Sequence, residues 1–102
     1  MSAFKHLSIN QVKEFVDNNT AQLIDVRDQR SYQESHIVEA VNLNGETVHD
    51  FVKSADKNKP LICYCYHGHS SQSAATFFAE QGFKDVYSMD GGYEQWKTTY
   101  GT

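Results

Sequence analysis

One short stretch of the chain, CYCYHGHSSQS from Cys63 to Ser73, combines residue types that can do chemistry. An apolar run, LICYC, ends at Cys65, and a polar turn with two histidines and one glycine follows. Next comes SSQSAATFFAEQG, a sequence typical of a helix. A strand, a short turn and a helix can bind an anion, because the first N–H groups of a helix have no partners within it. We therefore predict an anion cradle with a reactive thiol at its floor.

The turn residues fit this chemistry. The N–H groups and the helix dipole favour a thiolate, so we expect the pKa of the Cys65 thiol to lie below its ordinary range. Gly68 allows the backbone to curl close to a ligand. Ser70 or Ser71 is expected to cap the helix. The two loop histidines, which add a positive field when protonated, are His67 and His69.

Two simpler interpretations compete with the reactive thiol. A cysteine at the end of a strand is often only a packing residue, and Cys63, inside the apolar run, is interpreted in that way. Four residues of zinc-ligand type also recur at every second position, namely Cys63, Cys65, His67 and His69. On an extended chain these four side chains line up and do not surround an ion. We therefore expect neither a metal nor a cofactor.

A cradle that begins with cysteine also suits a phosphatase or an arsenate reductase. Those enzymes need an arginine six positions after the cysteine, where it clamps the oxyanion through two hydrogen bonds. Ser71 occupies that position here, and no arginine follows Cys65 anywhere in the chain. The cradle must therefore rely on backbone N–H groups, which disfavours phosphoryl transfer.

The elements that must position these residues alternate along the chain. Strands are predicted over 21–26, 39–44, 61–65 and 85–89, with helices after Ser8 and over 45–55, 71–81 and 93–100. The polar stretch 28–36 is expected to contain about one helical turn. This alternation predicts an α/β fold, a central, mostly parallel sheet of about five strands with helices on both faces. The carboxyl ends of such strands meet at one edge, which brings Asp25, Arg27 and Cys65 close together.

The bulk properties exclude several classes of protein. A chain of 102 residues predicts one domain over 1–102. The formal net charge of -4 argues against a broad basic face for nucleic acid. No apolar run approaches the roughly 20 residues that span a bilayer, and the first ten residues lack the apolar stretch of a signal peptide. We expect a cytoplasmic protein that binds neither nucleic acid nor a membrane.

Four motifs, LIDVRD, SYQESHIVEAVNL, CYHGHSS and DGGYEQW, follow one another along the chain. In their order and spacing they resemble the rhodanese domain, over nearly the whole chain. The short chain and the CYHG-x-SS loop are most similar to the GlpE-type single-domain thiosulfate sulfurtransferases of bacteria. The resemblance implies a single rhodanese-like domain.

The resemblance also implies a reaction. Cys65 would take the outer sulfur of thiosulfate as a persulfide, release sulfite, and pass the sulfur to cyanide or to a dithiol protein such as thioredoxin. Many rhodanese loops carry Arg or Lys beside the cysteine, and this one does not. The alternative is a non-catalytic rhodanese-like module that docks partners, which has no need of the thiol. The backbone amides expected to hold the anion are those of Tyr66, His67, Gly68, His69 and Ser70, with Arg27 and Ser71 as supporting residues.

Overall fold

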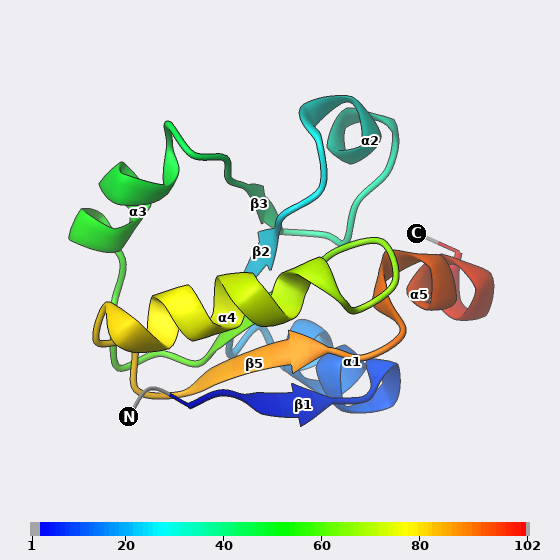
Figure 1. Ribbon diagram of the computed structural model, residues 1–102. Helices are drawn as coiled ribbons and strands as arrows, with labels where there is room; N and C mark the ends of the chain where they lie inside the picture. Colours follow the sequence, from blue (N-terminus) through cyan, green and yellow to red (C-terminus); the bar gives the residue numbers. More distant parts are fainter. Residues whose placement is uncertain (1–2, 102) are drawn as a thin grey trace.

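Strands and helices alternate along the whole described chain, residues 3–101, in the computed structural model (Figure 1). The strands are β1 (Lys5–Leu7), β2 (Gln22–Asp25), β3 (Val41–Asn42), β4 (Leu61–Tyr64) and β5 (Val86–Met89). The helices are α1 (Ile9–Asn18), α2 (Gln29–Glu34), α3 (Val48–Ser54), α4 (Ser70–Glu80) and α5 (Gly92–Tyr100). This order confirms the predicted α/β class.

The sheet has the strand order β1-β5-β4-β2-β3, and the four pairings between neighbouring strands are parallel. All strands therefore end at the same edge of the sheet. Asp25 at the end of β2 is paired with Tyr64 at the end of β4. The segments that contain Arg27 and Cys65 therefore leave the sheet from the ends of two neighbouring strands.

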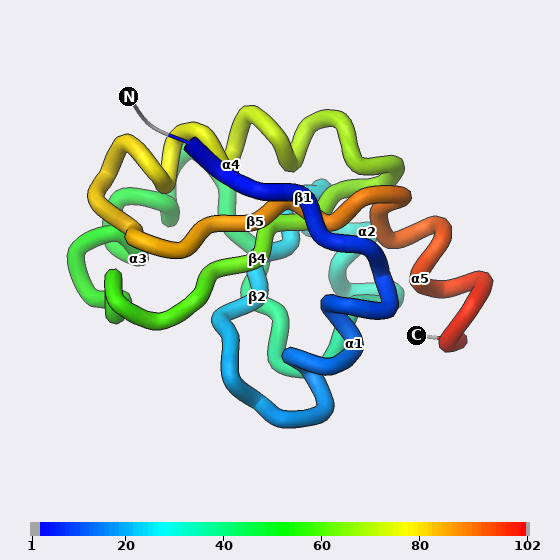
Figure 2. The backbone as a smooth tube through the Cα atoms, turned by 90° about the horizontal axis from the view of Figure 1, so that it is seen from below, coloured from blue at the N-terminus to red at the C-terminus, as the bar shows by residue number. Residues whose placement is uncertain are grey.

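Two separate apolar clusters cover the two faces of the sheet. One joins α1 and α5 to the sheet through residues such as Val12, Ile62 and Trp96. The other joins α3 and α4 to it through Phe51, Cys63 and Phe78. Figure 2 shows α4 and α1 on opposite sides of the strands. Because both faces are covered, the inner strands β2, β4 and β5 are buried over most of their length, which is typical of parallel sheets.

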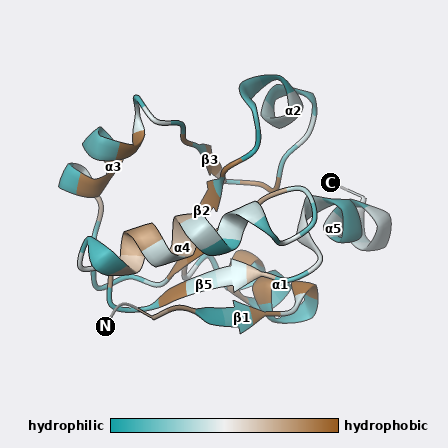
Figure 3. Ribbon diagram, viewed as in Figure 1, coloured by the Kyte–Doolittle hydropathy of each residue, from teal (hydrophilic) through white to brown (hydrophobic). Residues whose placement is uncertain are grey.

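The edge strand β1 has no counterpart in the sequence prediction. Lys5 and His6 are exposed, and only Leu7 is buried. Figure 3 shows the contrast, with β1 mostly hydrophilic and β2, in the interior of the sheet, hydrophobic. A strand of three residues with one buried side chain has too little periodicity to be found from sequence, and it forms because it pairs with β5.

The helix starts are predicted correctly in one case and wrongly in another. The first helix begins directly after Ser8, as expected, and Ser8 caps it in a capping box with Gln11. For α4 the expected cap by Ser70 or Ser71 is wrong, because the N-cap is His69 and no side chain caps the helix. Ser71 is instead buried inside the first turn, where its hydroxyl is hydrogen-bonded to Ser88. The first N–H groups of α4 are therefore left available to the loop before it.

Two segments between the strands differ from their predicted extent. The strand expected over 39–44 shortens to the two residues of β3. The stretch 28–36 contains the six-residue α2. Its N-cap is Asp28, whose carboxylate accepts a hydrogen bond from the Ser31 N–H group. Short strands at a sheet edge and short capped helices depend on such local contacts more than on apolar periodicity.

Candidate active site

Cys65 is the first residue after β4, and hydrogen-bond donors from the following turn surround its sulfur. The N–H group of Gly68 donates to Sγ at 3.3 Å and that of Ser71 at 3.2 Å. The hydroxyl oxygen of Ser71 lies 3.4 Å from the same sulfur. Gly68 has a φ of 95°, a backbone conformation that residues other than glycine rarely adopt. The turn thus curls around the sulfur as a cradle closed by the first turn of α4.

A second hydroxyl lies behind the first. Ser71 Oγ is 2.8 Å from Ser88 Oγ on β5, and both serines are fully buried. When Cys65 is a thiolate, Ser71 must donate its single hydroxyl hydrogen to the sulfur, so Ser88 must donate to Ser71. The sequence offers no sign of Ser88, because Ser88 reaches Ser71 only through the parallel pairing of β5 with β4.

The two cysteines have opposite electrostatic environments although only one residue separates them. Burial by itself raises the pKa of the Cys65 thiol, but hydrogen bonds from the Ser71 hydroxyl and from the N–H groups of Ser71, Gly68 and His67 outweigh it. The pKa of Cys65 is therefore lowered. Burial raises the pKa of Cys63 far above its ordinary range. Both cysteines are free, and only Cys65 has the environment of a nucleophile.

The predicted cradle residues divide into two groups. Gly68, and His67 through its N–H group, act on the sulfur. Within residues 3–101, Tyr66, His69 and Ser70 donate no hydrogen bond to it, and their side chains are exposed, as is that of His67. Ser71, predicted only as a support, supplies two of the sulfur's contacts. The helical spacing could have indicated this role, because Ser71 lies three residues before Ala74 and four before Ala75. That spacing puts Ser71 on the helix face turned to the core.

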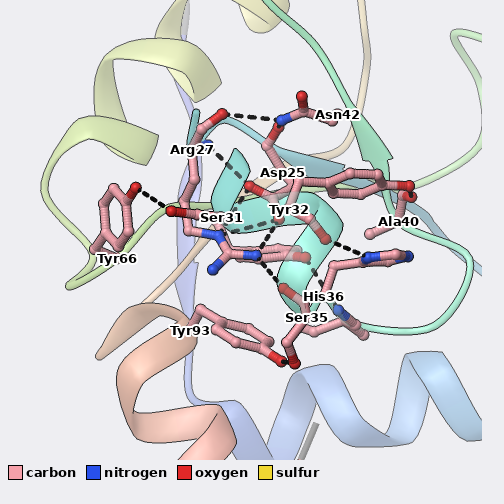
Figure 4. Close-up of polar contacts among 12 residues, drawn as sticks. Asp25, Arg27, Ser31, Tyr32, Ser35, His36, Ala40, Asn42, Tyr66 and Tyr93 are labelled. Atoms are coloured by element: carbon pink, nitrogen blue, oxygen red, sulfur yellow. Dashed lines mark hydrogen bonds and ion pairs between the residues drawn. The ribbon is translucent and has the colours of Figure 1, made fainter. Parts of the chain in front are cut away.

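Arg27 belongs to a buried ion pair beside the cradle. Its guanidinium donates to both carboxylate oxygens of Asp25, at 2.7 to 3.1 Å, and to the Ser35 carbonyl at 2.6 Å. The guanidinium carbon also lies 4.2 Å from the centre of the Tyr93 ring. Figure 4 shows these residues around it. Arg27 thus joins β2 to the segment after α2, and its side-chain contacts within residues 3–101 do not include Cys65.

Tyr66 connects the loop to α2. Its phenol oxygen lies 2.7 Å from Ser31 Oγ (Figure 4). It also donates to the carboxylate of Asp28. Asp28 is also the N-cap of α2. The side chain of Tyr66 therefore anchors the loop to the start of α2.

Two properties of residues 3–101 bear on other classes of site. They contain no group of three or more His, Cys, Asp or Glu side chains placed to hold a metal ion. No helix among them has the length and apolar character needed to cross a bilayer.

The comparison with known families and proteins agrees with this fold. Residues 8–99 match the family model of the rhodanese-like domain. The thiosulfate sulfurtransferase GlpE of Shewanella oneidensis is 49% identical over 96 residues, which cover 94% of this chain and 95% of that protein. GlpE of Pseudomonas aeruginosa is 44% identical over 97 residues, 95% of this chain and 87% of that protein. The chain therefore belongs to the rhodanese-like domain family, which confirms the resemblance seen in the sequence.

Solved structures of low sequence identity share the fold. A rhodanese-related protein from Thermoplasma volcanium superposes with a TM-score of 0.82 at 18% identity, covering 95% of this chain and 94% of that one. The Alr3790 protein from Anabaena also gives 0.82, at 23% identity, over 92% of this chain and 77% of that one.

Proposed function

We propose that this protein is a thiosulfate sulfurtransferase that carries sulfur as a persulfide on Cys65. The observation that carries the proposal is the set of donors directed at one sulfur atom, two N–H groups and a hydroxyl. The names of the curated GlpE relatives support the choice of thiosulfate as donor.

The first half of the reaction needs a thiolate and an anion cradle. The Cys65 thiolate attacks the outer sulfur of thiosulfate, the sulfur–sulfur bond of thiosulfate breaks, and sulfite leaves with the bonding electron pair. The charge balances, because a thiolate and a dianion give a persulfide anion and a dianion. No general base is needed when the thiolate is already formed, which is the effect of the Ser71, Gly68 and His67 donors.

The second half returns the enzyme to its starting state. A nucleophile such as cyanide, or one thiolate of a dithiol, attacks the outer sulfur of the persulfide and leaves the Cys65 thiolate behind. The N–H groups of Tyr66, His69 and Ser70, which do not bond to Sγ, are proposed to hold the transferred sulfur or the sulfite oxygens at the mouth of the cradle. Arg27 acts in this proposal only as a structural support.

The cellular acceptor is proposed to be a dithiol protein of the thioredoxin kind. Both cysteines are free. A persulfide carrier of this kind suits a reducing compartment such as the cytoplasm, where dithiols are kept reduced.

The test is a thiocyanate assay with thiosulfate and cyanide. We expect turnover by the wild type, none above background by Cys65→Ser, and turnover by Cys63→Ala, which keeps the cradle and removes the other thiol. Turnover that persists in Cys65→Ser would contradict the assignment of the nucleophile. A wild type without activity, with thiosulfate and cyanide both in excess, would exclude thiosulfate as the donor.

A further inference from the structure

The reverse side of the cradle loop rests on the first turn of α5. The N–H group of Tyr93 donates to the Cys65 carbonyl at 2.8 Å, and the N–H group of Glu94 donates to the Tyr66 carbonyl at 3.1 Å. N–H groups in the first turn of a helix have no acceptor within that helix. Here they receive two consecutive carbonyls of the loop, so α5 holds the loop by its backbone.

These two bonds fix the direction of the neighbouring N–H groups. In a trans peptide the C=O group and the following N–H group point in opposite directions within one plane. Since α5 binds the Tyr66 carbonyl, the His67 N–H group of the same peptide must point away from α5. That N–H group is one of the donors that favour the Cys65 thiolate. The contact with α5, on the reverse side of the loop, thus sets the orientation of the His67 N–H group.

The approach is close enough to require glycine. A Cβ atom on Gly92 would lie 2.3 Å from the Tyr66 carbonyl oxygen and 2.5 Å from the His67 nitrogen. Such contacts with backbone atoms cannot be relieved by moving a side chain. The facing residue of the loop is also a glycine, since a Cβ atom on Gly68 would lie 3.1 Å from the Gly91 nitrogen. Two backbone segments therefore pack directly against each other, without side chains between them.

Gly91, the neighbouring glycine, differs in one respect. Its φ is 79° against 64° for Gly92, so alanine would be strained at both positions. The three heavy atoms nearest to a Cβ atom on Gly91, however, all belong to the side chain of Gln95. That side chain is exposed and can move aside. The two glycines thus share a backbone strain and differ in contact with the cradle.

We propose that Gly92 and the N–H groups of Tyr93 and Glu94 are positioning elements for sulfur transfer: they hold the Cys65 and Tyr66 carbonyls and thereby turn the His67 N–H group toward the sulfur. The inference rests on the proposed function for its biological meaning. The contacts that support it bear only on the ionisation of the Cys65 thiol. None of these residues touches the reacting sulfur, so they act through the loop.

The first test compares Gly92→Ala with Gly91→Ala. The readout is the rate at which iodoacetamide alkylates Cys65 across pH, followed by mass spectrometry, with the fold checked by circular dichroism. We expect Gly92→Ala to alkylate about tenfold or more slowly near neutral pH, the effect of losing one hydrogen bond to a charged group. The rates should converge at high pH, where the Cys65 thiol is ionised in each of the proteins. Gly91→Ala should stay within about twofold of the wild type.

Two results would overturn the proposal. One is a folded Gly92→Ala with the pH profile of the wild type. The other is an equal slowing in both glycine variants, which would assign the effect to backbone strain and not to contact with the loop. The internal reference is Cys63, which is buried and should stay unreactive in every folded variant.

A second pair of variants decides the matter if Gly92→Ala does not fold. Glu94→Pro removes the N–H group that binds the Tyr66 carbonyl, at a position in the first helical turn where proline is tolerated. Glu94→Ala keeps that N–H group. We expect slow alkylation near neutral pH only in Glu94→Pro, and equal profiles in the pair would overturn the proposal. Because alkylation needs no thiosulfate, the result stands even where the thiosulfate assay fails, and the two proposals fail separately.

Discussion

At the scale of single residues, backbone geometry distinguishes two cysteines that composition alone makes equal. Cys63 and Cys65 lie in the same apolar run, yet one is packed among α4 side chains and the other receives hydrogen bonds from its own loop. The sequence was enough to predict that a turn containing Gly68 curls around the Cys65 thiol, because a cysteine, a glycine turn and a helix start form one local pattern. The contact of Ser88 with Ser71 could not be predicted from sequence. Ser88 is distant from Ser71 along the chain, and only the pairing of β5 with β4 brings the two together.

The Ser71 hydroxyl is predicted to stabilise the thiolate. Ser71→Ala removes a donor from the sulfur, so the pKa of Cys65 should rise and its alkylation near neutral pH should slow by about tenfold. The loss should vanish at a pH well above the pKa of the variant. Ser73→Ala, an exposed change in the same helix, is the control and should match the wild type. A profile of Ser71→Ala that also matches the wild type would show that the hydroxyl does not act on the sulfur.

Ser88 is predicted to act only through Ser71. With Ser88→Ala, the Ser71 hydroxyl loses the donor that compensates for its bond to the sulfur, so alkylation should slow, but less than in Ser71→Ala. In the double variant Ser71→Ala with Ser88→Ala, the second change should add almost nothing. Fully additive slowing, measured by the same alkylation profile, would mean that Ser88 affects the sulfur by a route that bypasses Ser71.

At the scale of elements, the site depends on the N-termini of three helices, each with a different role. The N-terminus of α4 donates to the sulfur, that of α5 holds the loop carbonyls, and the cap of α2 binds Tyr66. Apolar spacing was enough to predict the helix over 71–81 and the strands 21–26 and 61–65. It gave no indication that α4 lacks a side-chain cap or that α5 supports the loop, because both features arise from contacts between segments distant in sequence.

The buried pair of Arg27 and Asp25 is predicted to stabilise the edge of the sheet near the site. Arg27→Ala leaves the fully buried Asp25 carboxylate without its partner, which should lower the free energy of unfolding by about 3–5 kcal/mol. Urea denaturation measures the effect. Arg30→Ala, at an exposed position in α2, should change stability by less than about 0.5 kcal/mol. Equal, small effects of both changes would show that the ion pair contributes little.

At the scale of the whole molecule, the cradle links stability to pH. The pKa of Cys65 is lower in the folded protein than its unfolded value of 9.0. A lowered pKa gives a stabilising contribution that is fully present above the unfolded pKa and is lost as the pH falls through the folded pKa. Cys63, whose pKa is raised by burial, acts in the opposite sense and only once the pH approaches 9.0 or more. The range below 9.0 therefore isolates Cys65.

We predict a measurable form of this linkage. Between neutral pH and about 9, the free energy of unfolding of the wild type should rise relative to that of Cys65→Ala. Urea titrations at several pH values give the difference, with Cys63→Ala as a control that should keep the rise. A difference that stays flat across this range, or falls, would contradict a thiolate stabilised by the fold.

The most direct test of the central claim is the intact mass of the protein before and after incubation with thiosulfate. A persulfide on Cys65 predicts the gain of one sulfur atom by the wild type and by Cys63→Ala, its absence in Cys65→Ser, and its removal by cyanide. Peptide mapping should place the added sulfur on the peptide that contains Cys65. A wild type that gains no sulfur, or a Cys65→Ser protein that still gains one, would contradict the account.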